Sequence, residues 1–192
     1  VRSHGTVGRF FAKGYSPDHA DIGPALSAFV RRLSDTPVPE SLRSAMEPGS
    51  GLRHFLADPA DGSACKRLNL YLRWMVRRDG LDFGIWPDIP ASKLVIPLDT
   101  HVARIGRRLG LTVRSAADWK MAVEITEVLR QFDPDDPVKY DFALCTAGKL
   151  QACPDPSDRD DCPDCPFAGF CVEKKKKWNA DLRRGQRMDG RG

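Results

Sequence analysis

Residues 94–111 read LVIPLDTHVARIGRRLGL, a short apolar run that leads into a pattern typical of an amphipathic helix. Pro97 disfavours a helical conformation for Ile96, so the run before it is expected to be extended. Asp99 is a suitable N-cap for a helix over 100–109, because its carboxylate can accept hydrogen bonds from the first amides. The residues expected to face the core at helical spacing are Val102, Ile105 and Leu109.

Upstream of this stretch, residues 65–78 (CKRLNLYLRWMVRR) predict a helix that is apolar on most of its sides. A helix of this kind is usually central to a fold. Residues 20–34 predict a second amphipathic helix from their helical spacing of apolar residues. The intervening residues 35–63 are rich in Pro, Gly and Ser, which favours a short helix between loops.

Downstream, Ser115 and Asp118 resemble a capping box that would open a helix over 116–131. Asp136 followed by Pro137 predicts another helix start, with a helix running to about residue 150. In the helix over 116–131, the residues expected to point inward are Met121, Ile125, Val128 and Phe132. The pattern as a whole predicts an all-α fold.

Four of the six cysteines lie within residues 153–171, with the spacing C-x8-C-x2-C-x5-C. A C-x2-C pair brings two thiolates to one metal centre, and the flanking cysteines can complete a tetrahedral site. Thiolates suit both zinc and iron–sulfur clusters, so spacing alone leaves these two open. Cys65 and Cys145 are expected to be ordinary buried thiols. The predicted metal ligands are Cys153, Cys162, Cys165 and Cys171.

Length and composition set the remaining bounds. With 192 residues, 41% of them hydrophobic and 29% charged, the chain fits a folded domain rather than a disordered one. Its apolar runs are too short to cross a bilayer, and its first residues lack the features of a signal peptide. We therefore expect a monomeric cytoplasmic protein, and we expect no disulfides in that compartment. A net charge of +4 permits nucleic-acid binding without demonstrating it.

Two of these stretches together resemble a known family. IPLDTHVARIGRRLGL resembles the segment that carries the catalytic aspartate of helix-hairpin-helix DNA glycosylases of the endonuclease III superfamily. PVKYDFALCTAGKLQAC and CPDCPFAGFC resemble the helix and loop that hold their C-terminal 4Fe-4S cluster. A bacterial branch of that superfamily also has segments like CKRLNLYLRWMVR and GIW. The resemblance spans roughly residues 60–178.

The resemblance implies a glycosylase-like helical domain with a structural 4Fe-4S cluster, in place of zinc, and duplex DNA as partner. It implies that Asp99 stabilises the positive charge that develops on the sugar. It also singles out Lys66 as the amine that attacks C1′, since this lysine begins a buried helix whose positive end favours a neutral amine. Lys93 is a weaker alternative. Phe83 and Trp86 could stack on a flipped base or pack in the core.

The chain departs from the family in two places. DPADGSAC occupies the position of the glycine-rich hairpin, with Gly62 in common, and the hairpin normally binds a phosphate. The segment PDPSDRDD between the first two cluster cysteines is acidic and would repel DNA. Because of these departures, two alternative functions remain: a nucleic-acid-binding protein without catalysis, or a structural iron–sulfur or zinc protein.

The resulting domain prediction has four parts: an N-terminal helical segment over 1–60, the glycosylase-like domain over 61–150, the cluster loop over 151–178 and a disordered basic tail over 179–192. Relatives have more helices before the lysine-bearing segment than 65 residues can easily hold, which leaves truncation of the N-terminal segment open. Phosphate contacts are predicted for Arg104, Arg107, Arg108, Lys174 and Lys175.

Overall fold

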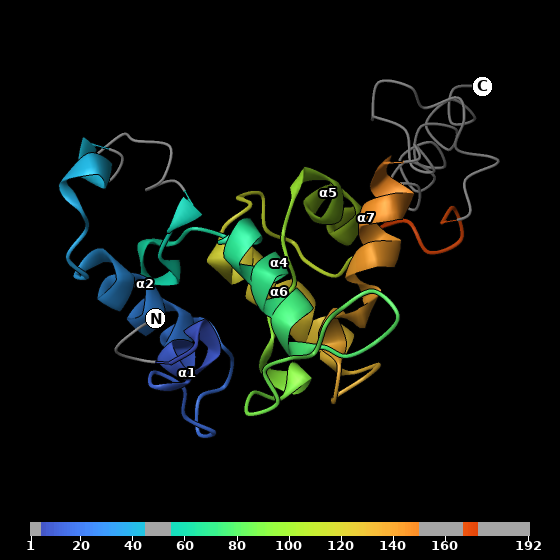
Figure 1. The fold of residues 1–192 in the computed structure, drawn as a ribbon. Coiled ribbons are helices and arrows are strands. Elements are labelled where there is room, and N and C mark those ends of the chain that lie inside the picture. Colours follow the sequence, from blue (N-terminus) through green and yellow to red (C-terminus); the bar gives the residue numbers. More distant parts are fainter. Residues whose placement is uncertain (1–4, 45–54, 150–166, 173–192) are drawn as a thin grey trace, which may run out of the picture.

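The computed structural model describes residues 5–44, 55–149 and 167–172, and within these ranges the chain is helical and contains no strand (Figure 1). The all-α prediction is confirmed for this part of the chain. None of the helices described is long and apolar enough to cross a membrane. The α-helices are α1 (Val7–Ala12), α2 (Gly23–Ser34), α4 (Lys66–Val76), α5 (Thr100–Arg108), α6 (Trp119–Arg130) and α7 (Asp141–Lys149). Short 3-10 helices are η1 (Glu40–Leu42), η3 (Pro59–Asp61), η4 (Ala91–Lys93) and η5 (Pro137–Tyr140).

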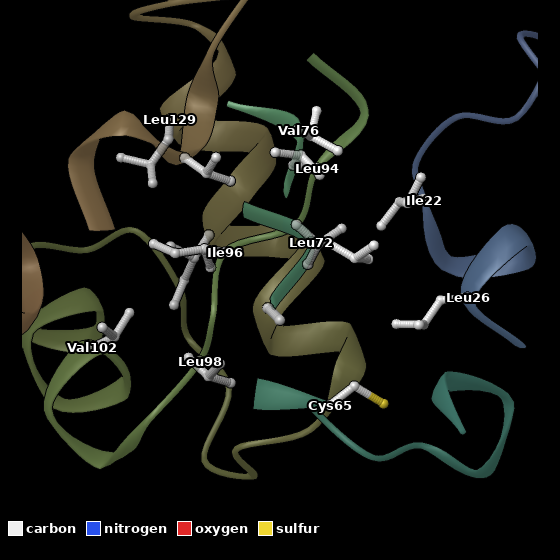
Figure 2. Close-up of a cluster of buried hydrophobic side chains, with 14 of the residues drawn as sticks. Ile22, Leu26, Cys65, Leu72, Val76, Leu94, Ile96, Leu98, Val102 and Leu129 are labelled. Atoms are coloured by element: carbon white, nitrogen blue, oxygen red, sulfur yellow. The ribbon is translucent and has the colours of Figure 1, made fainter. Parts of the chain in front are cut away.

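Helix α4 contributes to the centre of the hydrophobic core, as its sequence predicted. Figure 2 shows Leu72 of α4 with Ile22 and Leu26 on one side and Leu98 on the other. The core therefore includes residues from both sides of the predicted boundary between residues 60 and 61. The short helix expected within residues 35–63 corresponds to η1 and η3.

The run of residues 94–98 crosses the core as irregular backbone. Leu94, Val95, Ile96 and Leu98 are all fully or nearly fully buried. A buried backbone amide needs a partner, and the amide of Ile96 finds one in Oγ1 of Thr126 on α6, at 3.0 Å. This buried run fixes the point at which the chain enters α5.

Helix α6 begins three residues later than the capping box predicted, so that prediction was wrong. Asp118, rather than Ser115, is the N-cap, and its side chain accepts a hydrogen bond from the amide of Met121 at 2.8 Å. Aspartate caps a helix at least as well as serine, so the later residue competes successfully. The inward position of Phe132 was also wrong: the helix ends at Arg130, and this side chain is 69% exposed.

Helices α5 and α7 lie side by side (Figure 1). The predicted start at Pro137 is a 3-10 turn that continues directly into α7. Gly148 permits the close packing, because a Cβ at this position would lie 2.6 Å from Cβ of His101 on α5. This contact gives His101 a structural place between the helices and brings the C-terminal end of α7 to the start of α5.

The segment between α4 and η4 folds back along α4. The amides of Phe83 and Trp86 donate to the carbonyl groups of Trp74 and Met75, each at 2.8 Å. Trp86 is buried against Phe11, with ring centroids 5.5 Å apart, and so belongs to the core. Phe83 is 66% exposed and remains free of core packing.

Candidate functional site

Lys66 and Asp99, which are 33 positions apart in the sequence (99 − 66), form an ion pair in the structure. Nζ of Lys66 lies 3.3 Å from Oδ2 of Asp99. The lysine is the first residue of α4 and the aspartate is the N-cap of α5. The lysine side chain is 49% exposed, whereas that of the aspartate is 10% exposed. One member of the pair therefore reaches solvent and the other is held within the protein.

The path between the two residues explains the wide gap in sequence. Helix α4 leads away from Lys66, the segment 77–93 turns back along the helix, and the buried run 94–98 returns to Asp99. Lys93, the weaker alternative to Lys66, is remote from this contact. Its ammonium group donates to the carbonyl groups of Pro17, at 2.9 Å, and His19.

Asp99 is held through both of its carboxylate oxygens. Oδ1 accepts a hydrogen bond from the amide of Val102 at 2.8 Å, which confirms the predicted N-cap. Oδ2 faces Lys66 and also Sγ of Cys145 on α7, at 3.6 Å. Burial by itself would raise the pKa of Asp99, but the Val102 amide, the Lys66 ammonium and the Cys145 thiol together hold it below its usual value. Asp99 is therefore ionised at neutral pH.

The ion pair lies in the wall of a cavity of about 360 Å³. This volume falls at the small end of the range for ligand-binding pockets. The apolar part of the wall consists of Leu70, Trp74, Leu81, Pro97 and Phe142. The polar part consists of Lys66, Arg73, Asp82, Asp99, Asp141, Cys145, Thr146 and Lys149. The cavity thus offers apolar side chains beside a carboxylate and an amine.

A buried ion network joins three sides of this cavity. Nε of Arg73 on α4 lies 3.1 Å from Oδ2 of Asp82, and its Nη1 lies 2.5 Å from Oδ2 of Asp141 on α7. Arg77 also contacts Asp82, and its Nε donates to both carboxylate oxygens of Asp136 at 2.9 Å. Because the charges are paired, they can remain buried. The network ties α4 to the following loop and to α7.

Asp141 differs from Asp99 in its electrostatics, although both line the cavity. Burial raises the pKa of Asp141; the Arg73 guanidinium opposes this effect, and the nearby carboxylates of Asp99 and Asp82 add to it. Two carboxyl groups in one cavity thus have pKa values displaced in opposite directions. Such a separation is a feature of sites that perform acid–base chemistry.

The arginines predicted to contact phosphate have local partners. Nη2 of Arg104 donates to the carbonyl of Gly148 at 2.7 Å, which ties α5 to α7. Nη1 of Arg107 donates to the carbonyl of Ser115 at 3.0 Å. Arg108 lies in the last turn of α5 and also has an interaction of its own. Lys174 and Lys175 lie outside the described residues, so their predicted role stays a prediction.

The segment DPADGSAC forms a tight turn ahead of α4. Asp58 caps η3 through the amide of Ala60, and Gly62 adopts a left-handed conformation with φ of 82°. The carbonyl of Gly62 accepts a hydrogen bond from the amide of Trp119 at 3.0 Å. Cys65 is buried, as expected, and burial raises the pKa of its thiol to about 11. The turn therefore fixes the start of α4, and with it Lys66, against α6.

Of the four predicted metal ligands, Cys171 lies in the described part of the chain and is half-buried. Cys153, Cys162 and Cys165 lie outside it, so their ligand role stays a prediction. Within the described ranges, no group of three or more His, Cys, Asp or Glu residues could hold a metal ion. A Cβ at Gly110 would lie 3.1 Å from a methyl of Val172, which places the end of the cysteine segment beside the C-terminal end of α5.

Several cavity residues were not singled out by the sequence analysis, notably Arg73, Asp82 and Asp141. A signal for one of them was present. Lys66, Asn69 and Arg73 follow the spacing i, i+3, i+7, a polar stripe on a helix that is otherwise largely apolar. Asp82 and Asp141 lie in segments without such periodicity, so no local pattern distinguished them.

Comparison with known proteins identifies the family. Residues 1–150 match the model of the family described as Protein of unknown function (DUF2400), and the chain belongs to this family. The matched region includes Lys66, Asp99 and Cys145 and ends before Cys153. No curated protein and no solved structure matches the chain.

Proposed function

We propose that this member of the DUF2400 family is a DNA glycosylase-like base-excision repair protein that acts on a damaged or mismatched base in duplex DNA. One observation carries the proposal: Nζ of Lys66 lies 3.3 Å from Oδ2 of Asp99 in the wall of a cavity. The resemblance to helix-hairpin-helix glycosylases singled out these two residues separately. Their contact across 33 positions of sequence (99 − 66) is what an acid–base pair requires.

The chemistry assigned to the pair is cleavage of the N-glycosidic bond. The base departs with the electron pair of that bond, and positive charge develops on the sugar. The ionised carboxylate of Asp99 stabilises this charge. In a route through a Schiff base, Asp99 first takes a proton from the Lys66 ammonium, and the resulting amine attacks C1′. In a purely hydrolytic route, Asp99 takes a proton from the attacking water.

The apolar wall of the cavity supports the binding of a base taken out of the stack. Trp74 and Phe142 line the cavity and are 40% and 58% exposed. Leu81 lines it as well, and Phe83 lies next to Trp74 through a backbone hydrogen bond. Exposed flat side chains beside polar groups suit a flipped base, which is held by stacking and by hydrogen bonds to its edge.

The proposal includes a 4Fe-4S cluster held by Cys153, Cys162, Cys165 and Cys171, with zinc as the alternative. The donor set fits, because four closely spaced thiolates can bind one cluster. When bound, the cluster would tie the C-terminal segment to the helical domain beside α5. Anaerobically purified protein should be brown with about four irons per chain. Colourless protein with one zinc would contradict the cluster.

Borohydride trapping tests the proposed function. Duplexes that carry a panel of oxidised, alkylated, deaminated and mismatched bases are incubated with the wild-type protein, and released base and covalent adduct are measured. We expect base release from at least one duplex. If a Schiff base forms, the adduct should disappear in Lys66→Ala. The control is Lys120→Ala, an exposed lysine on α6 outside the cavity.

If no base is released from any duplex, the enzymatic proposal fails. DNA binding that persists in Asp99→Asn without any base release would identify a nucleic-acid-binding protein that lacks catalysis. Absence of DNA binding at low salt would instead favour a structural metalloprotein.

A further inference from the structure

Cys145 is a cavity residue to which the proposed reaction assigns no step. It lies on α7, is half-buried, and its Sγ is 3.6 Å from Oδ2 of Asp99. This separation is within the range for a hydrogen bond that involves sulfur, which is longer than one between oxygen and nitrogen. The thiol thus meets the same carboxylate oxygen that faces Lys66.

The position of Cys145 is determined by the packing of α7 against α5. Gly148 lets the two helices approach, since a Cβ there would overlap His101. Nη2 of Arg104 donates to the carbonyl of Gly148 at 2.7 Å and fixes the register of the helices. Cys145 is three residues before Gly148 and therefore lies on the same face of α7. The face that packs on α5 thereby carries the thiol to the N-cap aspartate.

The protonation states of the two groups agree with this contact. Burial raises the pKa of the Cys145 thiol, and the negative charge of Asp99 raises it further, whereas Lys149 opposes these effects. The thiol therefore keeps its proton at neutral pH and can donate it in a hydrogen bond. A thiol that resists ionisation is a poor nucleophile, so its role lies in this hydrogen bond.

We propose that Cys145 is a positioning residue, whose S–H donates to Oδ2 of Asp99 and holds that oxygen towards Lys66 while the Val102 amide holds Oδ1. The proposal rests on the proposed function for its effect on catalysis. Its structural part, the orientation and ionisation of Asp99, can be measured without activity. Loss of the thiol would leave Oδ2 with one fixed partner fewer and make the charged carboxylate less favourable.

Other charged and titratable groups lie near Asp99 and must be considered in any titration. They are Lys66 and Arg73 on α4, Asp82 on the following loop, His101 on α5, and Asp141, Cys145 and Lys149 on α7. Substitution of Cys145 leaves all the others in place, so a change in the titration of Asp99 can be attributed to the thiol.

The experiment compares Cys145→Ala with Cys145→Ser, which retains an O–H donor. The pKa of Asp99 is followed by carbon NMR of its carboxyl group in both variants and in the wild-type protein. We expect the Ala variant to raise this pKa by about half a unit, the size expected for loss of one weak hydrogen bond to a carboxylate. The Ser variant should restore it. In the Ala variant, the acidic limb of the pH–rate profile for base release should shift to higher pH by the same amount.

An unchanged Asp99 pKa in Cys145→Ala would overturn the positioning role, even if the wild-type protein releases bases. A raised pKa that Ser restores would support the role, even if the wild-type protein releases no base from any duplex. In that second case the proposed function fails and the positioning contact stands. Cys145→Ser also guards against misfolding, because it changes one atom of the side chain.

Discussion

The starts of α5 and α6 have nearly the same local structure but different surroundings. Asp99 and Asp118 are both N-caps, with φ of −119° and −116° and ψ of −178° in each. Each side chain accepts a hydrogen bond from the amide three residues later at 2.8 Å. Asp118 then pairs with Arg114, four residues earlier, on the surface. Asp99 instead meets Lys66 and Cys145, which come from two other helices.

This comparison separates what a cap requires from what a site requires. The hydrogen bond to the third amide is a local property that any well-placed aspartate supplies. The burial of Asp99, its contact with an amine and its place in a cavity wall all depend on distant parts of the chain. A functional role for Asp99 therefore rests on its tertiary surroundings, and Asp118 provides a natural control for the cap alone.

The largest expected effect concerns two arginines: Arg73, which lines the same cavity as Asp99, and Arg114, which pairs with the cap Asp118. Arg73→Leu would leave Asp141 buried without its ion-pair partner and Asp82 with Arg77 alone, and should lower the free energy of unfolding by about 3–5 kcal/mol. Arg114→Leu removes an ion pair on the surface and should cost far less, because solvent screens exposed pairs. Urea unfolding of both variants measures the two costs. Equal losses of unfolding free energy in the two variants would show that the buried ion network is no more stabilising than the surface ion pair.

Loss of the caps themselves should have a smaller and more equal effect. Asp118→Ala and Asp99→Ala each remove one capping hydrogen bond, so each should lower the free energy of unfolding by about 1 kcal/mol. At Asp99 the lost contact with Lys66 is offset because the variant no longer buries a carboxylate. Urea unfolding at neutral pH gives both values. A cost at Asp99 several times that at Asp118 would indicate a mainly structural role for the ion pair.

The smallest expected effect is on the pH dependence of stability. Neighbouring groups hold the pKa of both Asp99 and Asp118 below that of an unfolded aspartate, which is about 3.9. Each carboxylate therefore stabilises the fold above about pH 4, and this stabilisation is lost as the pH falls through the folded pKa. The stability differences between wild type and the Asp99→Asn and Asp118→Asn variants should shrink below pH 4. A constant difference down to pH 2 would contradict the lowered pKa values.

Asp141 should respond in the opposite sense. Its pKa is raised in the folded protein. Its ionisation therefore destabilises the fold once the pH exceeds the pKa that this group has in the unfolded chain. Asp141→Asn removes this penalty and should reduce the loss of stability between pH 4 and neutral pH. The same unfolding series measures it, and a steeper loss in the variant would contradict the assignment.

The sequence predicted local features better than tertiary ones. The cap at Asp99 and the helix that begins at Lys66 were predicted because both depend on a few neighbouring residues. The contact between these two residues could not be predicted from their separation in the sequence, because it depends on the path of residues 77–98. The predicted N-cap of α6 was wrong because Ser115 and Asp118 are both good capping residues, and the local sequence does not decide between them.

The buried polar residues were the hardest part of the site to predict. Arg73 lies on a helix predicted to be central, but its pairing with Asp141, 68 residues later, is a long-range property. Cys145 was expected to be an ordinary buried thiol, whereas it lines the cavity and meets Asp99. Neither contact has a local signature, since both arise from the packing of α7 beside α4 and α5.

Base release under single-turnover conditions by the wild-type, Asp99→Asn and Asp118→Asn proteins tests the central claim most directly. Asparagine caps a helix about as well as aspartate, so both variants should fold. Loss of the charge at Asp99 should reduce the rate about 10²–10³-fold, the usual cost of removing one electrostatic contact to the transition state. Asp118→Asn should match the wild type. Equal rates for all three proteins would show that Asp99 is a cap like Asp118 and would contradict the proposed site.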